Sequence, residues 1–132
     1  IKLETQWPMG SAAKSPKLVE LAGEAAKGVI GTYPTFSQDT PEFLAFKDAW
    51  EKKYPDKKMP IFGEYNYDMV KLTAKALKAA QSMSVEDVRS ALIEASKGYM
   101  GVTGEKTFDA NGDVGATYGR WTVKGGNIED YK

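Results

Sequence analysis

The hydrophobic and polar residues of this chain alternate between the two-residue period of strands and the longer period of helices. Apolar side chains recur every three or four residues in four stretches, and this spacing predicts amphipathic helices. Shorter runs alternate or are continuously apolar, which is typical of strands. The expected elements are strands over 1–7 and 29–33, helices over 16–27, 41–54, 66–81 and 85–97, and two strands within 107–123. This order indicates an α/β fold.

Three of the predicted helices begin at residues that favour a helix N-terminus. Ser15 and Thr40 each precede a proline. Their hydroxyls can accept hydrogen bonds from the free amides of the first turn, and proline at the first position loses no internal hydrogen bond. Ser84 and Asp87 resemble a capping box. Helices or strands are expected to stop at Pro8, Gly28, Pro34 and Pro55.

The predicted helices carry more apolar surface than the predicted strands can cover. Over 66–81 one face holds Tyr67, Val70, Ala74 and Leu77, and the other holds Asp68, Lys71, Lys75 and Lys78. The helix after Ser84 has a stripe of Val85, Val88, Leu92 and Ala95. Such helices need a sheet to pack on, so we expect a fragment of a larger fold with apolar side chains left bare. Those expected to be bare are Phe43, Phe46, Trp50, Val70 and Leu77.

Composition and charge exclude several classes of function. Eighteen Lys and Arg balance eighteen Asp and Glu, so no large field attracts nucleic acid or anionic lipid. The chain has no cysteine and no histidine, which removes thiol nucleophiles, Ser-His and Cys-His pairs and the usual zinc sites. The segment 101–104 lacks the lysine and the spacing of a phosphate-binding loop. With no catalytic, metal-binding or cofactor-binding set, we predict a protein that is not an enzyme.

The segment 109–113 is interpreted as a tight turn between two strands, because Asn-Gly favours such a turn. Asp109, Asn111 and Asp113 also occupy the first, third and fifth positions of a calcium-loop pattern. That pattern fails further on, where Val114 replaces the required glycine and Arg120 the bidentate glutamate. The sequence therefore favours a turn over a calcium site.

A set of aromatic side chains stands where predicted strands end and predicted helices begin. In open α/β folds ligands bind at the carboxyl ends of strands, so these rings are candidates for the wall of a pocket. Taken singly, each ring is also explained by core filling, and Glu64, which lies among them, by solvent exposure. The set is Trp7, Tyr33, Phe36, Phe62, Tyr65 and Tyr67.

Several short segments become specific through their order and spacing. They are Met9-Gly10, Leu21–Val29, Phe62 with Tyr67 opening a helix, Val102–Gly104, Phe108–Asp113 and Trp121–Gly125. Together they resemble the C-terminal portion of a type I periplasmic solute-binding protein, of the leucine/isoleucine/valine-binding kind that serves ABC importers. The resemblance covers nearly the whole chain.

The resemblance implies part of a two-lobed, Rossmann-like periplasmic-binding-protein fold with a C-terminal β-hairpin. Residues 1–34 would form a strand-helix-strand segment of the second lobe, 35–106 helices of the first lobe, and 107–132 a hairpin returning to the second. It also implies that ligand binds between the lobes, which close around it by a hinge, and that importer membrane subunits recognise the closed form. The alternative is the ligand-binding region of a sensor or receptor with the same fold.

The resemblance also carries over a few binding positions. Phe62 matches an aromatic position whose ring contacts the ligand side chain in branched-chain amino-acid binders. Ala12, next to Ser11, matches a position where amino-acid binders of the family place a carboxylate for the ligand ammonium. An unpaired buried ammonium is costly, so we expect a ligand that lacks one, such as an aromatic or keto carboxylate, unless Glu64 supplies the acid. The full predicted ligand-binding set is Ser11, Ala12, Tyr33, Phe62, Glu64 and Tyr65.

Location and partners follow from the same resemblance. A periplasmic or extracytoplasmic location is implied, and the chain, which begins at Ile1, shows no signal peptide. Helices that lack a sheet lead us to expect the remainder of the same protein, or a second copy in a swapped or intertwined homodimer, as a partner. A small-molecule ligand and the importer's membrane subunits are the other expected partners; nucleic acid and cofactors are not expected.

Overall fold

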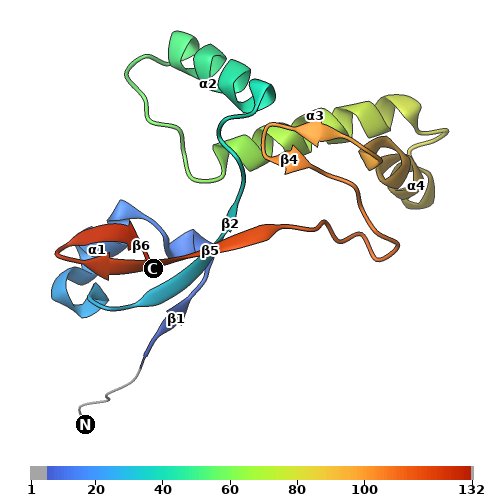
Figure 1. Ribbon diagram of the computed structural model, residues 1–132. Helices are drawn as coiled ribbons and strands as arrows, with labels where there is room; N and C mark the ends of the chain where they lie inside the picture. The colour runs from blue at the N-terminus through green and yellow to red at the C-terminus, as the bar shows by residue number, and fades with distance from the viewer. Residues whose placement is uncertain (1–5, 132) are drawn as a thin grey trace. The chain divides into compact units, whose positions relative to one another are not determined.

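The computed structural model describes residues 6–131, which form two compact units (Figure 1). The first unit is built from both ends of the described chain, up to Thr35 and from Ala116 onward, and the second contains Phe36–Gly115. The chain thus leaves the first unit after Thr35 and returns to it after Gly115. Helices and strands occur together, which confirms the predicted α/β class.

The first unit contains a four-stranded sheet. Its strands are β1 (Pro8–Met9), β2 (Ile30–Thr35), β5 (Thr117–Lys124) and β6 (Asn127–Asp130), in the spatial order β1-β2-β5-β6. Strand β1 runs parallel to β2, whereas β5 is antiparallel to both of its neighbours. In Figure 1, β6 folds back along β5 at the C-terminal end of the chain.

Two prolines lie inside strands that the sequence predicted they would end. Pro8 lies in β1, an edge strand, and an edge position does not require the amide hydrogen that proline lacks. Pro34 lies in β2 beyond the two residues that pair with β1, so β2 has a neighbour on one side only at that point. The strand expected over 1–7 falls largely outside the described residues, and Gln6 and Trp7 belong to no strand.

The first helix begins where its capping residue predicted, but it ends at Ala22 rather than near residue 27. Helix α1 (Pro16–Ala22) begins after Ser15, whose hydroxyl accepts a hydrogen bond from the Lys17 amide at 3.2 Å. A 3-10 turn (Gly23–Ala26) continues it. The chain then turns at Gly28, whose φ of 77° suits glycine.

The core of the first unit is centred on one tryptophan. Trp121 of β5 is fully buried, and its ring lies against the strand residue Gly31, where a Cβ would be 2.3 Å from the Cε2 atom. Glycine at this position therefore makes room for the indole ring. The other buried members of the core are Ala26, Val29 and Val123.

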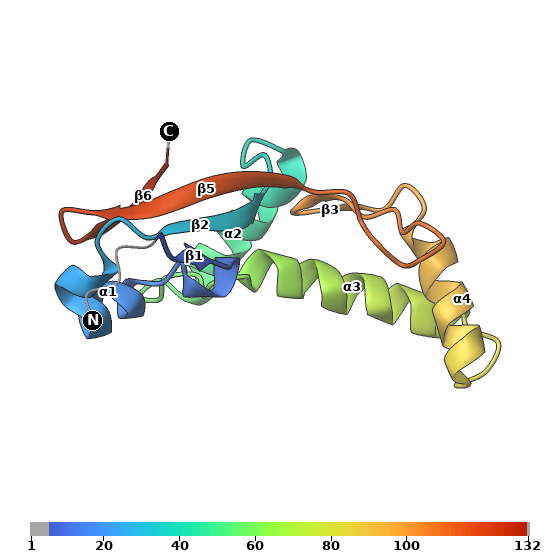
Figure 2. The same cartoon turned by 90° about the horizontal axis from the view of Figure 1, so that it is seen from below.

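The second unit is mainly helical. Its helices are α2 (Pro41–Lys53), α3 (Gly63–Ala79) and α4 (Val85–Ser96). The Thr40 and Ser84 hydroxyls cap α2 and α4 by accepting hydrogen bonds from the Phe43 and Asp87 amides, as predicted. Figures 1 and 2 both show α4 packed near the C-terminal end of α3.

The buried face of α3 is not the apolar face seen in the sequence. Leu72 and Ala76 pack against Ala95 of α4. Asp68, placed on the solvent face by its periodicity, is only 3% exposed, and this prediction was wrong because the carboxylate binds backbone amides. Periodicity identified two faces of α3, but not which one this chain covers.

The expectation of bare apolar side chains is confirmed at some positions and wrong at others. Val70 and Leu77 are 63% and 39% exposed. Phe43, by contrast, is 7% exposed, because its ring packs against Phe36 with 5.4 Å between ring centroids. Val85, expected to lie on the inner stripe of α4, is 77% exposed.

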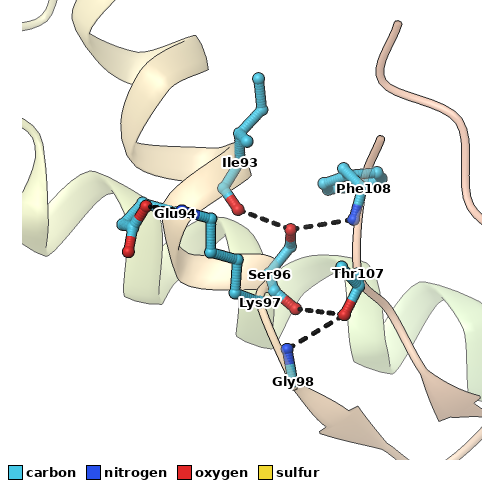
Figure 3. Close-up of polar contacts among 7 residues, drawn as sticks. All are labelled: Ile93, Glu94, Ser96, Lys97, Gly98, Thr107 and Phe108. Atoms are coloured by element: carbon cyan, nitrogen blue, oxygen red, sulfur yellow. Dashed lines mark hydrogen bonds and ion pairs between the residues drawn. The ribbon is translucent and has the colours of Figure 1, made fainter. Parts of the chain in front are cut away.

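A small hairpin follows α4 and was not predicted. Its strands are β3 (Met100–Gly101) and β4 (Gly104–Glu105). Figure 3 shows how the end of α4 is tied to the chain beyond this hairpin: the buried Ser96 hydroxyl donates to the Ile93 carbonyl at 2.7 Å and accepts from the Phe108 amide at 3.0 Å. The Thr107 hydroxyl accepts from the Gly98 amide at 3.0 Å.

The C-terminal hairpin is present, but its turn lies later than the sequence predicted. Strands β5 and β6 are joined at Gly125-Gly126, whose φ values of 56° and 77° favour glycine. The segment 109–113 does form a turn, in which the Asp109 amide donates to the Asp113 carbonyl at 2.9 Å. That turn closes a single bridge between Phe108 and Val114 rather than a pair of strands.

Candidate functional site

Four aromatic rings form a continuous cluster in the second unit. Phe62 meets Tyr65 with 6.0 Å between centroids, Tyr65 meets Phe36 edge-on at 5.6 Å, and Phe36 meets Phe43 at 5.4 Å. Edge and tilted contacts are the geometries that aromatic quadrupoles prefer. Phe36, Phe62 and Tyr65 are half-buried, so part of this surface faces solvent. We call these four residues the aromatic cluster.

Phe62 has an unusual backbone. Its φ of 62° and ψ of 18° lie in the left-handed region, and it is the only non-glycine residue with positive φ among residues 6–131. A bulky residue in this region is strained by about 1–2 kcal/mol. The surrounding chain holds it there, since the Gly63 amide donates to the Pro60 carbonyl and the Asn66 amide to the Phe62 carbonyl, both at 2.9 Å. Strain of this kind is often found where a side chain must be aimed at a ligand.

Glu64 lies in the first turn of α3 and is half-buried. It borders an open groove of about 750 Å³, to which α2 contributes Phe43 and Trp50. Several lysines, including Lys47, Lys57 and Lys58, border the same groove. Glu51 and Asp56 border it too, so the groove beside Glu64 carries charges of both signs.

Asp68 organises the hairpin turn that faces α3, and sequence reasoning missed this role. Its Oδ1 accepts from the Val102 amide at 2.7 Å, and its Oδ2 from the Thr103 amide at 2.9 Å and the Thr103 hydroxyl at 2.5 Å. Gly101 lets the carboxylate approach, because a Cβ there would be 2.5 Å from Cγ. No local signal in the sequence points to this role, because the groups that Asp68 binds lie more than thirty residues later in the chain.

Two titratable groups near Asp68 have shifted pKa values. Desolvation raises the pKa of Tyr99 above its ordinary 10.0, and the charge of Asp68 adds to that shift. Burial lowers the pKa of Lys106 below 10.5, and the charge of Asp68 opposes that shift. The buried carboxylate therefore influences both groups without forming an ion pair with either.

The first unit holds the other three predicted site residues. Ser11 and Ala12 lie in a 3-10 turn (Ser11–Ala13), with Ser11 half-buried and Ala12 exposed. The Tyr33 hydroxyl donates to Asp130 at 2.8 Å, and the Lys14 ammonium lies 3.1 Å from the Tyr33 ring centroid and 3.5 Å from Asp130. Asp130, a carboxylate beside Tyr33, was not among the predicted residues.

The structure brings some predicted residues together and leaves others apart. Phe62 and Tyr65 share the aromatic cluster, and Glu64 lies between them in sequence at the start of the same helix. Ser11 and Ala12 share a turn in the first unit, where Tyr33 is engaged with Lys14 and Asp130. Phe36 and Phe43 join the cluster although neither was in the predicted ligand-binding set.

Neither a metal-binding cluster nor a membrane-spanning helix is found among residues 6–131. No group of three or more acidic side chains is placed to hold a metal ion. No helix in this part of the chain combines the length and the apolar character needed to cross a membrane.

Solved structures show the same fold. The chain resembles a leucine-binding protein, LivK, from Thermotoga maritima with a TM-score of 0.74 and 23% identity, covering 98% of this chain and 37% of that one. It resembles LivJ, the branched-chain amino acid transporter substrate-binding protein from Streptococcus pneumoniae solved in complex with isoleucine, with a TM-score of 0.69 and 25% identity, covering 96% of this chain and 36% of that one. It also resembles a putative branched-chain amino acid ABC transporter from Rhodospirillum rubrum, with a TM-score of 0.59 and 28% identity, covering 98% of this chain and 38% of that one.

The chain therefore spans little more than a third of the length of these solved chains. No curated protein matches it. The sequence model of the periplasmic binding protein family matches residues 3–126, which is nearly the whole chain. This match and the shared fold show that the chain belongs to the periplasmic binding protein family.

Proposed function

We propose that this chain is part of the extracytoplasmic solute-binding component of an ABC importer. The observation that carries the proposal is the family match over residues 3–126. It is supported by the shared fold with LivK and LivJ, the latter solved with isoleucine. Members of this family bind solutes, and the side chains described above offer rings and charges for binding rather than a nucleophile with its base.

The aromatic cluster is the proposed contact for the apolar part of the ligand. Its half-buried rings present apolar surface, and Phe62 is held in a strained backbone conformation beside Tyr65. Glu64, at the start of the same helix, is proposed to face the ligand as well. Ser11, Ala12 and Tyr33 are proposed as the contribution of the first unit, and the assignment of residues 1–34 and 107–132 to one lobe and 35–106 to the other belongs to the same proposal.

The proposed ligand is a small carboxylate or an amino-acid-like molecule. Ala12 offers no carboxylate for a ligand ammonium, which argues against an ordinary aliphatic amino acid. Glu64 is the acid that could replace it, although lysines border the same groove. An acid without an ammonium, such as an aromatic or keto carboxylate, is therefore the favoured class.

Calorimetry on the intact protein that contains this chain tests the proposal. Leucine, its deaminated counterpart 4-methylpentanoate, and benzoate form a series that separates the ammonium from the apolar body. We expect the two acids without an ammonium to bind more tightly than leucine, and Phe62→Ala to weaken every ligand that binds. Tight binding of leucine with weak binding of both acids would contradict the ligand class; no binding in any arm of a broad solute panel would contradict the function.

The partner expected for this chain on its own is a second copy. Val70 and Leu77 leave apolar surface on α3 uncovered by the described residues, and burying such surface favours association. Light scattering on the 132-residue chain is expected to show a dimer or larger species. A stable monomer would contradict the proposed swapped or intertwined dimer.

A further inference from the structure

Asn111 stands in the turn 109–113, a segment that the proposed solute binding does not use. The asparagines of this chain are Asn66, Asn111 and Asn127, and among them only Asn111 is followed by glycine. Both Asn111 and Gly112 are exposed. Glycine has no side chain to hinder the approach of its own amide nitrogen to the preceding side chain. Asn111 is therefore the asparagine at which spontaneous deamidation is chemically easiest.

This deamidation requires only water besides the chain itself. The Gly112 amide nitrogen, once it has lost its proton to hydroxide, forms a bond to the Cγ atom of Asn111. The side-chain nitrogen takes up a proton and leaves as ammonia, so that a succinimide ring remains. Water then adds to either carbonyl of the ring and opens it to aspartate or isoaspartate. The product carries an additional negative charge, and isoaspartate also lengthens the backbone by one carbon.

The folded turn holds the attacking nitrogen back from this reaction. The Gly112 amide donates to the Asp109 carbonyl at 3.1 Å, so its proton is engaged in a hydrogen bond. The same turn is closed by the Asp109 amide, which donates to the Asp113 carbonyl at 2.9 Å. Attack on Asn111 therefore requires the turn to open first, and the rate depends on how often it opens.

The Asp109 carboxylate holds this turn closed. Its Oδ1 accepts from the Asn111 amide at 2.8 Å and from the Asp113 amide at 2.9 Å. Hydrogen bonds from backbone amides, that of Asp113 foremost, lower the pKa of the Asp109 carboxyl below its ordinary 3.8. The group is thus ionised at neutral pH, and an ionised acceptor binds amides more strongly than a neutral one. One side chain therefore fixes the amides at both ends of the segment 111–113.

Contacts on either side anchor the turn to the second unit. The Arg89 guanidinium of α4 donates to the Ala110 carbonyl at 3.1 Å. The Phe108 amide donates to the buried Ser96 hydroxyl (Figure 3), and Phe108 forms a bridge with Val114 across the turn. Because these contacts flank the turn, it can open without disturbance of the helices.

We propose that Asn111 is a site of spontaneous deamidation and that the Asp109 carboxylate protects it by keeping the turn closed. Asp109 is a positioning residue here, since it takes no part in the bonds that form and break and acts through the turn. The site lies outside the residues proposed to touch the ligand, and it does not depend on the solute-binding function.

Timed incubation of the intact protein that contains this chain tests the proposal. The protein is kept at mildly alkaline pH, where the Gly112 amide is deprotonated more often. Peptide mapping by mass spectrometry then measures the conversion of Asn111 to aspartate and isoaspartate. The same protein in guanidinium is the unfolded reference. We expect conversion at Asn111 in both states, slower in the folded protein by at least about 10-fold, with Asn66 and Asn127 nearly unchanged.

Substitutions in the turn test the role of the carboxylate. Asp109→Ala should speed conversion in the folded protein by at least about 3-fold, because two hydrogen bonds that close the turn are lost. Asp109→Asn keeps the shape and a neutral acceptor, so its rate should be intermediate. The matched control is Asp113→Ala, which removes the same charge from the same turn but keeps the Asp109 carboxylate and should change the rate little. All four proteins should react at nearly the same rate in guanidinium.

Each part of the proposal has an outcome that overturns it. Absence of aspartate and isoaspartate at residue 111 in both the folded and the unfolded protein would exclude the site. Equal rates in these two states, or an unchanged folded-state rate in Asp109→Ala, would exclude protection by the turn. Equal acceleration in Asp109→Ala and Asp113→Ala would assign the effect to charge alone and overturn the role of the Asp109 hydrogen bonds.

Discussion

Replacement of Asp68 by alanine should destabilise the second unit more than any other single loss of a carboxylate in it. The side chain is 3% exposed and accepts three hydrogen bonds from Val102 and Thr103, which are both 5% exposed. Without the carboxylate, two buried backbone amides lose their acceptor, at a cost of about 1–3 kcal/mol each. The expected loss is therefore about 2–6 kcal/mol, a large share of the stability of an ordinary domain.

The assay is guanidinium denaturation of the intact protein followed by far-UV circular dichroism, with amide hydrogen exchange as a local probe. Asp68→Asn keeps the shape and one acceptor oxygen, so it should lose about half as much and keep the protein folded for the exchange measurement. The Val102 and Thr103 amides should then exchange faster than in the unmodified protein. Asp48→Ala serves as control, because Asp48 is exposed and pairs only with Lys52. Unchanged stability in Asp68→Ala, with both amides still protected, would refute the reasoning.

Three further predictions concern other positions. Gly31→Ala should destabilise the first unit by about 1–3 kcal/mol or more, because a Cβ would be 2.3 Å from the Trp121 ring. The control Gly10→Ala, with nothing within 4 Å of its Cβ, should be tolerated. Equal denaturation midpoints for the two variants would contradict the clash at Gly31. Phe62→Gly should be more stable than Phe62→Ala by about 1 kcal/mol, because glycine adopts a φ of 62° without strain, and the reverse order in thermal unfolding would argue against the left-handed backbone. The folded pKa of Tyr99 is raised, so its contribution to stability is fully present below pH about 10 and is lost as the pH rises through the folded pKa. Tyr99→Phe should therefore flatten the fall in stability in that alkaline range. An unchanged pH profile would exclude the effect.

Local signals predicted the helix starts well, because capping depends on neighbouring residues only. The Ser15, Thr40 and Ser84 hydroxyls each cap the helix expected from the sequence. The C-terminal hairpin was predicted as an element but not at the right turn, since Asn-Gly and Gly-Gly are both turn signals and only the pairing of β5 with β2 and β6 decides between them.

Burial could not be predicted from periodicity in the same way. Helix α3 has two faces, and the choice of Leu72 and Ala76 over Val70 and Leu77 depends on where α4 packs. Asp68 looked like a surface acid because its partners lie more than thirty residues away in sequence. Phe62 and Tyr65 were singled out by their position at a helix start, and the structure brings their rings together with 6.0 Å between centroids. Their role in ligand binding stays a prediction.

The strand order of the first unit has a consequence for how the protein is made. Strand β2 finds its long antiparallel neighbour only when Thr117–Lys124 has left the ribosome, whereas every segment of Phe36–Gly115 is contiguous. Local contacts form faster than distant ones. The helical unit can therefore fold during synthesis, whereas β1 and β2 complete their sheet only after β5 has been synthesised. A chain that terminated shortly after Gly115 would therefore retain the helices but would lack Trp121, which forms the centre of the core beside β2.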